Sequence, residues 1–386
     1  MSRFSAYLYE PLTGDRIAEV STWQECTYTR GLWGVGSGSL TLPWYDSAAV
    51  QAEPLTAALA VDQGRLLKWA GPVVGREFSP EQGLVRVGCQ NWWWYYNRRW
   101  IRSTLGMTHA EATDVGPYDV KFIDVDQFDI VDDLITHAAA VAADADMGLT
   151  VRMYGPGVGG ISDVVRTRDY FGYERKRIAQ SIEELASQSG GFDFVVTDEW
   201  DQGSEPWIPR RYLDLYYPRA GESSSTLVLE HGSNVSMLRM FDDGERMANP
   251  ITVAGAGIGD AAIAVEAVDT SLLYPAGPYP WLENDRQYRD EGTEYAGNLE
   301  RLAISELAVS RIPLRTIEVS ITEQEDGGIS LGDIGIGDSV SVVANVGDFH
   351  LDDRMRVISE TVTLSPEGLK NWKVSLVADD ATLGIV

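Results

Sequence analysis

The sequence predicts a mainly β protein of the α+β class, with two β-barrel-like domains, an inserted α/β module and a helix-containing linker. Short β-branched runs between clusters of Gly, Pro, Asp and Asn cover most of the chain, which is typical of short antiparallel strands. Apolar residues at helical spacing are confined to a few interior segments. A chain of 386 residues is also long enough for more than one domain.

Residues 1–105 are expected to form the N-terminal β-barrel-like domain. Turn signals separate runs of alternating apolar and polar residues, as in a small antiparallel barrel or sandwich. A glycine-rich run at 31–38 lacks the Lys-Ser/Thr pair and the following helix of a phosphate loop, so we interpret its glycines as turn or bulge positions. The expected strands cover residues 4–9, 17–28, 40–42, 55–61, 66–74 and 84–89.

An aromatic and basic tract closes this first unit. Side chains alternate between the two faces of a strand, so five adjacent rings on a strand cannot all point into one core. Tyr, Trp and Arg are favoured at protein interfaces. We therefore expect the tract partly to fill the barrel core and partly to form an interface between subunits or domains, rather than to stack on single-stranded nucleic acid. The tract comprises Trp92, Trp93, Trp94, Tyr95, Tyr96, Arg98, Arg99 and Arg102.

Residues 106–205 are expected to be an inserted α/β module. Two segments show the apolar spacing of amphipathic helices. Asp126 or Asp129 caps the first helix, and Gly190 and Gly191 end the second. The expected strands and helices cover residues 120–125, 130–142, 149–151, 176–189 and 192–196.

The rest of the chain returns to β structure. Residues 206–260 are expected to be a β return segment. Residues 261–313 are expected to be a linker with a helix that begins at Thr293 and ends before Pro313, since proline cannot continue a helix. Residues 314–386 are expected to form the C-terminal β-barrel-like domain.

The formal net charge is -27, from 31 Lys and Arg against 58 Asp and Glu. Binding to nucleic acid phosphates requires clustered Lys and Arg, so the chain is not expected to bind nucleic acid specifically. An acidic surface promotes solubility by self-repulsion, and it also suits a channel that must not retain a polyanion such as DNA. Both interpretations stay open at this point.

Sequence motifs for a cofactor, a metal or a membrane span are lacking. The four histidines have no ligand-like neighbours, and the Asp pairs do not match an EF-hand loop. Cys26 and Cys89 are interpreted as buried free thiols. No run of about 18 apolar residues is present and the N-terminus lacks a signal-peptide core, so we expect a protein that folds in the cytoplasm.

A carbohydrate-binding or carbohydrate-cleaving protein that acts on the host cell wall is the main alternative. Sugar rings stack on aromatic side chains, and glycoside hydrolysis requires two carboxyl groups at a set separation. The candidates are Asp198, Glu199 and Asp201, beside Trp200 and Trp207. With 58 acidic residues some acid–aromatic neighbours are inevitable, so we expect no enzyme activity.

Four patterns occur in order along nearly the whole chain. They are the strand pair 71–87 with the aromatic tract, the acidic strand and helix 124–142 with a second helix before Gly190, the helix 294–310 before Pro313, and the Gly-Asp turn and strand 331–342 with the strand 354–363. In this order they resemble the minor tail proteins of long-tailed actinobacterial phages that form the tail-tip (baseplate) hub.

The resemblance implies a structural virion protein, a homotrimer that closes the distal end of the phage tail tube. Two barrel-like tail-tube domains per chain would build a pseudo-sixfold ring, with the α/β module outside or below it. By this resemblance, the return segment 206–260 would complete the first ring domain begun by residues 1–105, and residues 314–386 would contribute to the other. The implied partners are the distal tail protein, the tape-measure protein and spike or receptor-binding proteins, and viral DNA passes through without specific binding. The implied location is the virion tail tip, after assembly in the host cytoplasm. No catalytic residue and no cofactor is implied.

Overall fold

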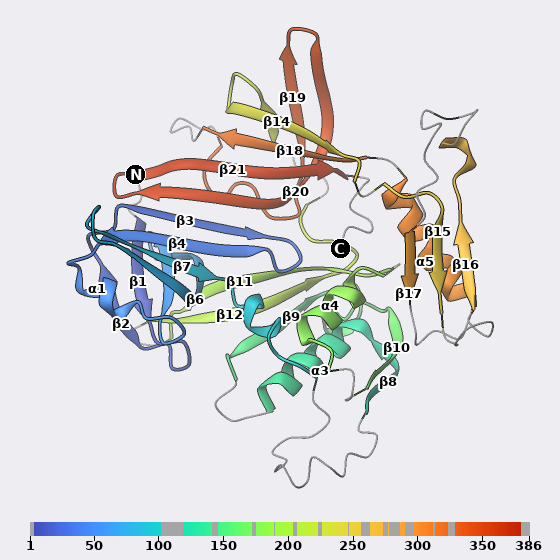
Figure 1. Cartoon of the computed structure of the whole chain (residues 1–386), viewed down its shortest axis with the longest axis horizontal. Coiled ribbons are helices and arrows are strands. Elements are labelled where there is room, and N and C mark those ends of the chain that lie inside the picture. Colours follow the sequence, from blue (N-terminus) through green and yellow to red (C-terminus); the bar gives the residue numbers. More distant parts are fainter. Residues whose placement is uncertain are drawn as a thin grey trace.

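The computed structural model of the chain is mainly β, as the sequence predicts (Figure 1). The residues that it describes are 4–101, 119–140, 146–171, 175–188, 190–203, 207–222, 226–245, 247–255, 263–272, 277, 286–289, 296–311, 313–322 and 329–379. Within them, no helix is both long enough and apolar enough to cross a membrane.

The first unit is an antiparallel sheet in the order β3-β4-β7-β6-β5-β1-β2. Its strands are β1 (Phe4–Tyr9), β2 (Arg16–Val20), β3 (Glu25–Gly31), β4 (Gly36–Pro43), β5 (Ala58–Gln63), β6 (Leu66–Ser79) and β7 (Leu84–Gln90), with the short helix α1 (Ser47–Gln51) after β4. The first half of β6 pairs with β5 and the second half with β7. A register shift between Val73 and Gly75 marks the change of partner, and such bulges bend a strand.

The C-terminal unit contains β13 (Val228–Glu230), β14 (Val235–Asp243), β18 (Leu314–Ile321), β19 (Ser339–Val346), β20 (Phe349–Ser365) and β21 (Gly368–Ala378). Its longest strand, β20, joins the two units. The first half of β20 pairs with β19, and residues 359–364 pair with β3 of the first unit. The red and blue sheets therefore run into each other in Figure 1 as one sheet of 13 strands.

This continuity corrects the expectation of two barrel-like domains. No closed barrel forms among the described strands, and one hydrophobic cluster contains both Leu40 of β4 and Trp372 of β21. The strands of 206–260 also lie elsewhere than expected: β13 pairs with β19 and β14 with β18, both in the C-terminal unit. Alternating hydrophobicity identifies a buried face but not the strand that will pair with it, so the sequence pattern could not reveal these partners.

The α/β module lies below the two sheet units in Figure 1. Its helices occur close to the predicted positions, and the Asp126 carboxylate caps the first of them by accepting from the Phe128 N–H at 2.9 Å. In the module β8 pairs with β10, and β12 lies between β11 and β9. The elements are β8 (Asp119–Asp126), α3 (Gln127–Ala140), β9 (Leu149–Tyr154), η3 (Val158–Gly160), β10 (Val165–Phe171), α4 (Ile178–Ala186), β11 (Asp193–Asp201) and β12 (Ile208–Tyr216).

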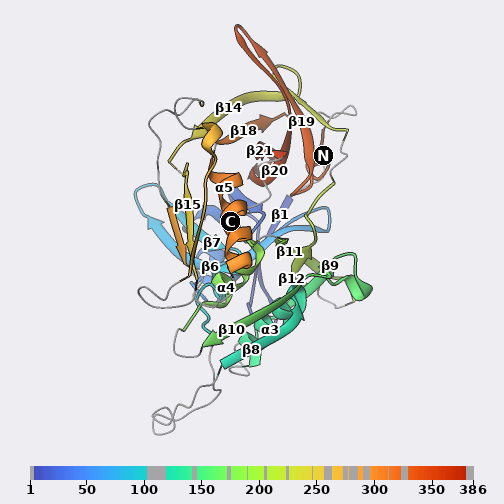
Figure 2. The ribbon, with the colours of Figure 1, turned by 90° about the vertical axis from the view of Figure 1, so that its right-hand side faces the viewer.

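The expected linker, 261–313, forms a small folded unit together with β15 from the expected return segment, seen at the right of Figure 1 and toward the viewer in Figure 2. It consists of β15 (Ile251–Ala254), β16 (Ala264–Ala267), η5 (Thr270–Leu272), β17 (Arg286–Arg289) and α5 (Ala296–Ser310). The helix packs Leu299 and Ala303 against Ile251 and Val253 of the sheet. The predicted cap Thr293 lies outside the described residues.

Candidate functional site

From the sequence we treat the aromatic tract as part of a strand, but the structure shows a helical turn there. Residues Trp93–Tyr96 form a single helical turn, α2, directly after β7. The Asn91 side chain donates to the Gly34 carbonyl at 2.8 Å, and the Tyr95 N–H bonds back to the Trp92 carbonyl at 3.1 Å. The first bond ties the start of the tract to a loop 57 residues earlier in the chain, and the second closes the helical turn.

The turn places the rings on different sides. Trp92, Trp93 and Tyr96 are buried, whereas Trp94 and Tyr95 are half-buried. The residue Gly34, in the loop before β4, has φ +74°, and a Cβ there would lie 2.1 Å from the Trp93 ring. The loop and the tract therefore pack together only because this position is glycine.

The buried rings of the tract contact the α/β module of the same chain. Trp93 packs on Phe194 of β11 with 4.8 Å between ring centroids, and its indole N–H donates to Glu183 of α4 at 2.7 Å. Trp92 lies under the Arg211 guanidinium of β12, 3.6 Å from the ring centroid. The tract thus forms a contact between two units of the chain.

The basic residues Arg98 and Arg99 lie closer to the molecular surface than the buried rings of the tract. Arg98 is exposed and stacks over Trp94 at 4.1 Å, while the guanidinium of Arg99 lies 5.5 Å from the Tyr95 ring centroid. Arg102 lies outside the described residues. That part of the tract contacts another subunit remains a prediction.

Buried polar atoms gather where the first sheet meets β11 and β12. One Asp198 oxygen accepts from the Ala70 N–H at 2.9 Å. The other Asp198 oxygen, the Trp92 indole N–H and the Tyr9 hydroxyl are buried without a hydrogen-bond partner of proper geometry. Burial raises the pKa of Asp198 to about 7, although the Ala70 N–H and the nearby charge of Arg211 act in the opposite direction.

A rise in pH is expected to lower the free energy of unfolding through Asp198. Its folded pKa of about 7 lies above the ordinary value of 3.8, so between these values the folded protein holds a proton that the unfolded chain releases. The expected slope approaches about 1.4 kcal/mol per pH unit. Urea denaturation of the wild type and of Asp198→Asn at several pH values measures it. A stability difference between the two proteins that does not vary with pH contradicts the assignment.

The three carboxylates of the glycosidase alternative do not converge on one point. Successive side chains of a strand point to opposite faces, so Asp198 and Glu199 of β11 lie on different sides of the sheet. Glu199 forms an ion pair with Arg152 at 2.7 Å, and Asp201 forms one with Arg210 at 2.8 Å. Asp198 therefore does not face the other two acids, and Glu199 and Asp201, which share the opposite face, are each paired with an arginine.

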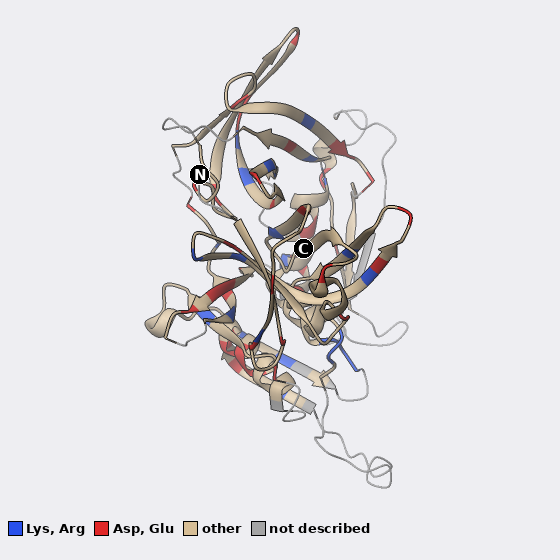
Figure 3. Ribbon diagram, turned by 90° about the vertical axis from the view of Figure 1, so that its left-hand side faces the viewer, with Lys and Arg blue, Asp and Glu red and all other residues tan. Residues whose placement is uncertain are grey.

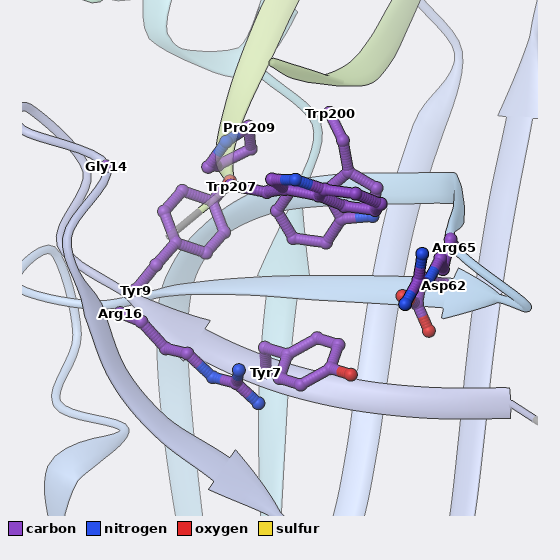
Figure 4. A pocket seen from close by; sticks show the side chains of 9 residues that line it. All are labelled: Tyr7, Tyr9, Gly14, Arg16, Asp62, Arg65, Trp200, Trp207 and Pro209. Atoms are coloured by element: carbon purple, nitrogen blue, oxygen red, sulfur yellow. The ribbon is translucent and has the colours of Figure 1, made fainter. Parts of the chain in front are cut away.

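The two tryptophans of that alternative do line a cavity, of about 350 Å³, between the first unit and the β11–β12 hairpin (Figure 4). We call it the aromatic pocket. Sequence reasoning identified Trp200 and Trp207 but missed the opposite wall, because that wall comes from strands far away in the sequence. The lining residues are Tyr7, Tyr9, Gly14, Arg16, Asp62, Arg65, Trp200, Trp207 and Pro209.

An exposed apolar surface at the outer end of the first unit was also missed. We call Trp44, Tyr45, Val50 and Phe78 the end patch; their exposed fractions are 57%, 76%, 68% and 48%. Arg76 fixes its shape by donating to the Val50 carbonyl at 2.7 Å and stacking over Phe78 at 4.9 Å. Large apolar side chains that are exposed near one another are typical of interaction surfaces.

Comparison with known proteins identifies the fold. No protein-family model matches the chain, and no curated protein matches it in sequence. Among solved structures, the chain is similar to the 43 kDa tail protein of prophage MuSo2 from Shewanella oneidensis, with TM-score 0.62 and 15% identity over 98% of this chain and 99% of that one. A tail protein from Neisseria meningitidis MC58 gives TM-score 0.60 and 12% identity over 99% and 98% of the two chains. Prophage tail protein gp18 from Listeria monocytogenes EGD-e gives TM-score 0.55 and 10% identity, over 98% of this chain and 96% of that one.

Proposed function

We propose that the chain is a structural protein of a phage tail, and more narrowly a trimeric hub that closes the distal end of the tail tube. The observation that carries this proposal is the shared fold: phage tail proteins match the arrangement of almost the entire chain, not of one domain only. The match includes both sheet units, the α/β module and the small unit around α5. A structural protein of this kind is not an enzyme.

The surface of the molecule supports assembly into a closed ring. The end patch exposes large apolar side chains on the first unit, and Phe241 of the C-terminal unit is 63% exposed on β14, which lies at an edge of the 13-stranded sheet. A ring with rotational symmetry requires two different complementary faces on each subunit. The end patch on the first unit and the exposed Phe241 on the C-terminal unit are two different apolar surfaces of one chain, as such a ring requires.

The distribution of charge supports a position around a DNA path. Acidic residues are spread over the units of the ribbon (Figure 3), within a chain of net charge -27. On α3, burial and the neighbouring carboxylates Asp126, Asp133 and Asp132 raise the pKa of Asp129, a sign of mutual repulsion. Such a surface repels DNA phosphates and lets DNA pass without binding. The proposed partners are the distal tail protein, the tape-measure protein and spike or receptor-binding proteins, at the virion tail tip after assembly in the host cytoplasm.

The double variant Trp44→Ser/Tyr45→Ser is expected to lose trimer formation while it keeps its fold. Both side chains are exposed, so the isolated chain loses little packing, whereas aromatic residues at an interface centre contribute about 2 kcal/mol or more each to association. Native mass spectrometry measures the oligomer, and thermal unfolding checks the fold. Val158→Ser, at a position 96% exposed on the α/β module, is the control and should assemble normally.

Three outcomes contradict the hub assignment or the choice of the end patch as the subunit interface. A wild-type chain that stays monomeric under all conditions, including with tail partners, argues against the hub. A double variant that still forms trimers shows that the end patch is not the subunit interface. An image of the assembled particle with this chain located away from the tail tip would also overturn the hub assignment.

A further inference from the structure

The aromatic pocket brings together side chains from the β1–β2, β5–β6 and β11–β12 hairpins. β1 supplies Tyr7 and Tyr9, and the β11–β12 hairpin supplies Trp200 and Trp207. In Figure 4 the two indole rings face Tyr7 across the hollow. Tyr7 meets Trp200 edge to face, with 6.1 Å between ring centroids. Aromatic side chains from β1 and from the β11–β12 hairpin therefore line the pocket together.

Charged groups stand at both ends of these walls. The Arg16 guanidinium stacks over Tyr7 at 4.0 Å, and that of Arg65 lies 5.4 Å from the Trp207 ring centroid. Figure 4 shows Arg16 at one end and Asp62 with Arg65 at the other. Arg16 also pairs with Glu19 at 2.9 Å, but Arg65 forms no ion pair among the described residues. Arg65 is therefore available to a ligand.

Buried polar atoms of the pocket lack partners. Tyr9 is only 2% exposed, and neither its hydroxyl nor the Trp200 indole N–H forms a well-aligned hydrogen bond, although the indole N–H lies close enough to Asp62 to oppose the rise in the pKa of that carboxyl on burial. The Asp62 carboxyl is 7% exposed beside them. Buried polar atoms without partners are unfavourable, so a ligand that donates and accepts hydrogen bonds would be stabilised here.

This combination of groups favours a sugar. The C–H faces of a pyranose ring pack on aromatic rings, which carry negative charge on their faces. Its hydroxyl groups donate to a carboxylate such as Asp62 and accept from N–H groups such as that of Trp200. A volume of about 350 Å³ suits a small ligand.

The local charge selects among sugars. Arg16 is already paired with Glu19, so the guanidinium of the pocket that can meet an anionic ligand is that of Arg65, although the whole chain has net charge -27. A guanidinium is the side chain best suited to bind a carboxylate through two parallel hydrogen bonds. We propose that the aromatic pocket binds a carboxylate-bearing pyranose, the acidic sugar unit of a glycan, with Arg65 on its carboxylate and Trp207 against its ring. Because the pocket lies within one chain, binding does not depend on ring assembly.

Titration of the full chain with D-glucuronate and with D-glucose, followed by ligand-observed NMR, tests the proposal. Glucuronate is expected to bind with a millimolar Kd, at least about fivefold tighter than glucose. Trp207→Ala is expected to weaken glucuronate binding by at least about tenfold, and Arg65→Gln to remove the preference over glucose. Trp100→Ala is the matched control, since Trp100 is 40% exposed and does not line the pocket.

If Trp207→Ala disturbs the fold, Arg65→Gln still tests the proposal. Arg65 is exposed, so its replacement is not expected to disturb the fold. The proposal is overturned by absence of saturable glucuronate binding at about 20 mM, or by binding that both variants retain. Binding of an acidic tripeptide without binding of glucuronate would instead identify the pocket as a protein-docking site. None of these outcomes bears on the trimer mass, so this inference and the hub proposal fail separately.

Discussion

Replacement of Asp193 by alanine is expected to lower the free energy of unfolding by about 3–5 kcal/mol, the cost of leaving a buried charge without its partner. The partner is Arg356 of β20, which is 1% exposed and forms a buried ion pair with the Asp193 carboxylate. In the variant the guanidinium stays buried and loses its anionic partner. Its remaining bonds to the Ala220 and Gly337 carbonyls, at 3.0 and 3.1 Å, do not neutralise its charge.

The size of this effect follows from the position of the pair. Asp193 belongs to β11 of the α/β module, and Arg356 belongs to the C-terminal unit. The same carboxylate accepts from the Trp33 indole N–H of the first unit at 3.1 Å and from the Ala220 N–H at 2.8 Å. One carboxylate therefore ties together three units that strand pairing alone connects only in part.

Urea denaturation measures the loss in the free energy of unfolding. Two further variants serve as controls, one at an exposed ion pair and one that removes both buried charges. Asp242→Ala removes the partner of Arg315 from an ion pair whose side chains are 43% and 44% exposed, and should cost no more than about 1 kcal/mol. Asp193→Leu/Arg356→Met should recover part of the loss, since it removes both buried charges. Equal losses for Asp193→Ala and Asp242→Ala would show that the buried pair does not hold the units together.

The second large effect is expected at Trp93, where alanine should cost about 3–5 kcal/mol. The side chain is 2% exposed and fills the space between the tract, β11 and α4. Its removal opens a cavity beside Phe194 and leaves the Glu183 carboxylate without its indole donor. Burial already raises the pKa of Glu183, and the indole N–H partly opposes this rise.

Thermal and urea unfolding of three variants separates packing from hydrogen bonding. Trp93→Phe keeps most of the ring contact and should cost about 1–3 kcal/mol for the lost donor. Trp94→Ala, at a half-buried position in the same turn, should cost clearly less than Trp93→Ala. If alanine costs the same at both positions, the tract does not serve as the contact between the first unit and the α/β module.

The aromatic tract shows how local and distant information differ. Its composition predicted both core and interface positions, and the structure buries Trp92, Trp93 and Tyr96 within the chain. The sequence did not reveal that the tract is a helical turn, because that depends on bonds such as the one from Asn91 to Gly34. Nor did it reveal which unit would cover the rings.

The sequence by itself determined the mainly β class, the two module helices and the free, buried state of Cys26 and Cys89, and it narrowed the cap of the first helix to Asp126 or Asp129, of which the structure shows Asp126. Each depends on residues within a few positions of one another, where periodicity and capping act. The helix α4 ends before Gly190, whose φ of +73° is the backbone conformation that glycine provides.

Only the tertiary structure decided the pairing of β20 with β3, the shared core of the two sheet units, and the Asp193–Arg356 pair. It also placed Tyr7 and Asp62 opposite Trp200 to form the aromatic pocket. Alternating hydrophobicity shows that a strand face is buried, and many strands offer such a face. Which of them meet depends on packing and hydrogen bonding between segments hundreds of residues apart, and no local pattern contains that information.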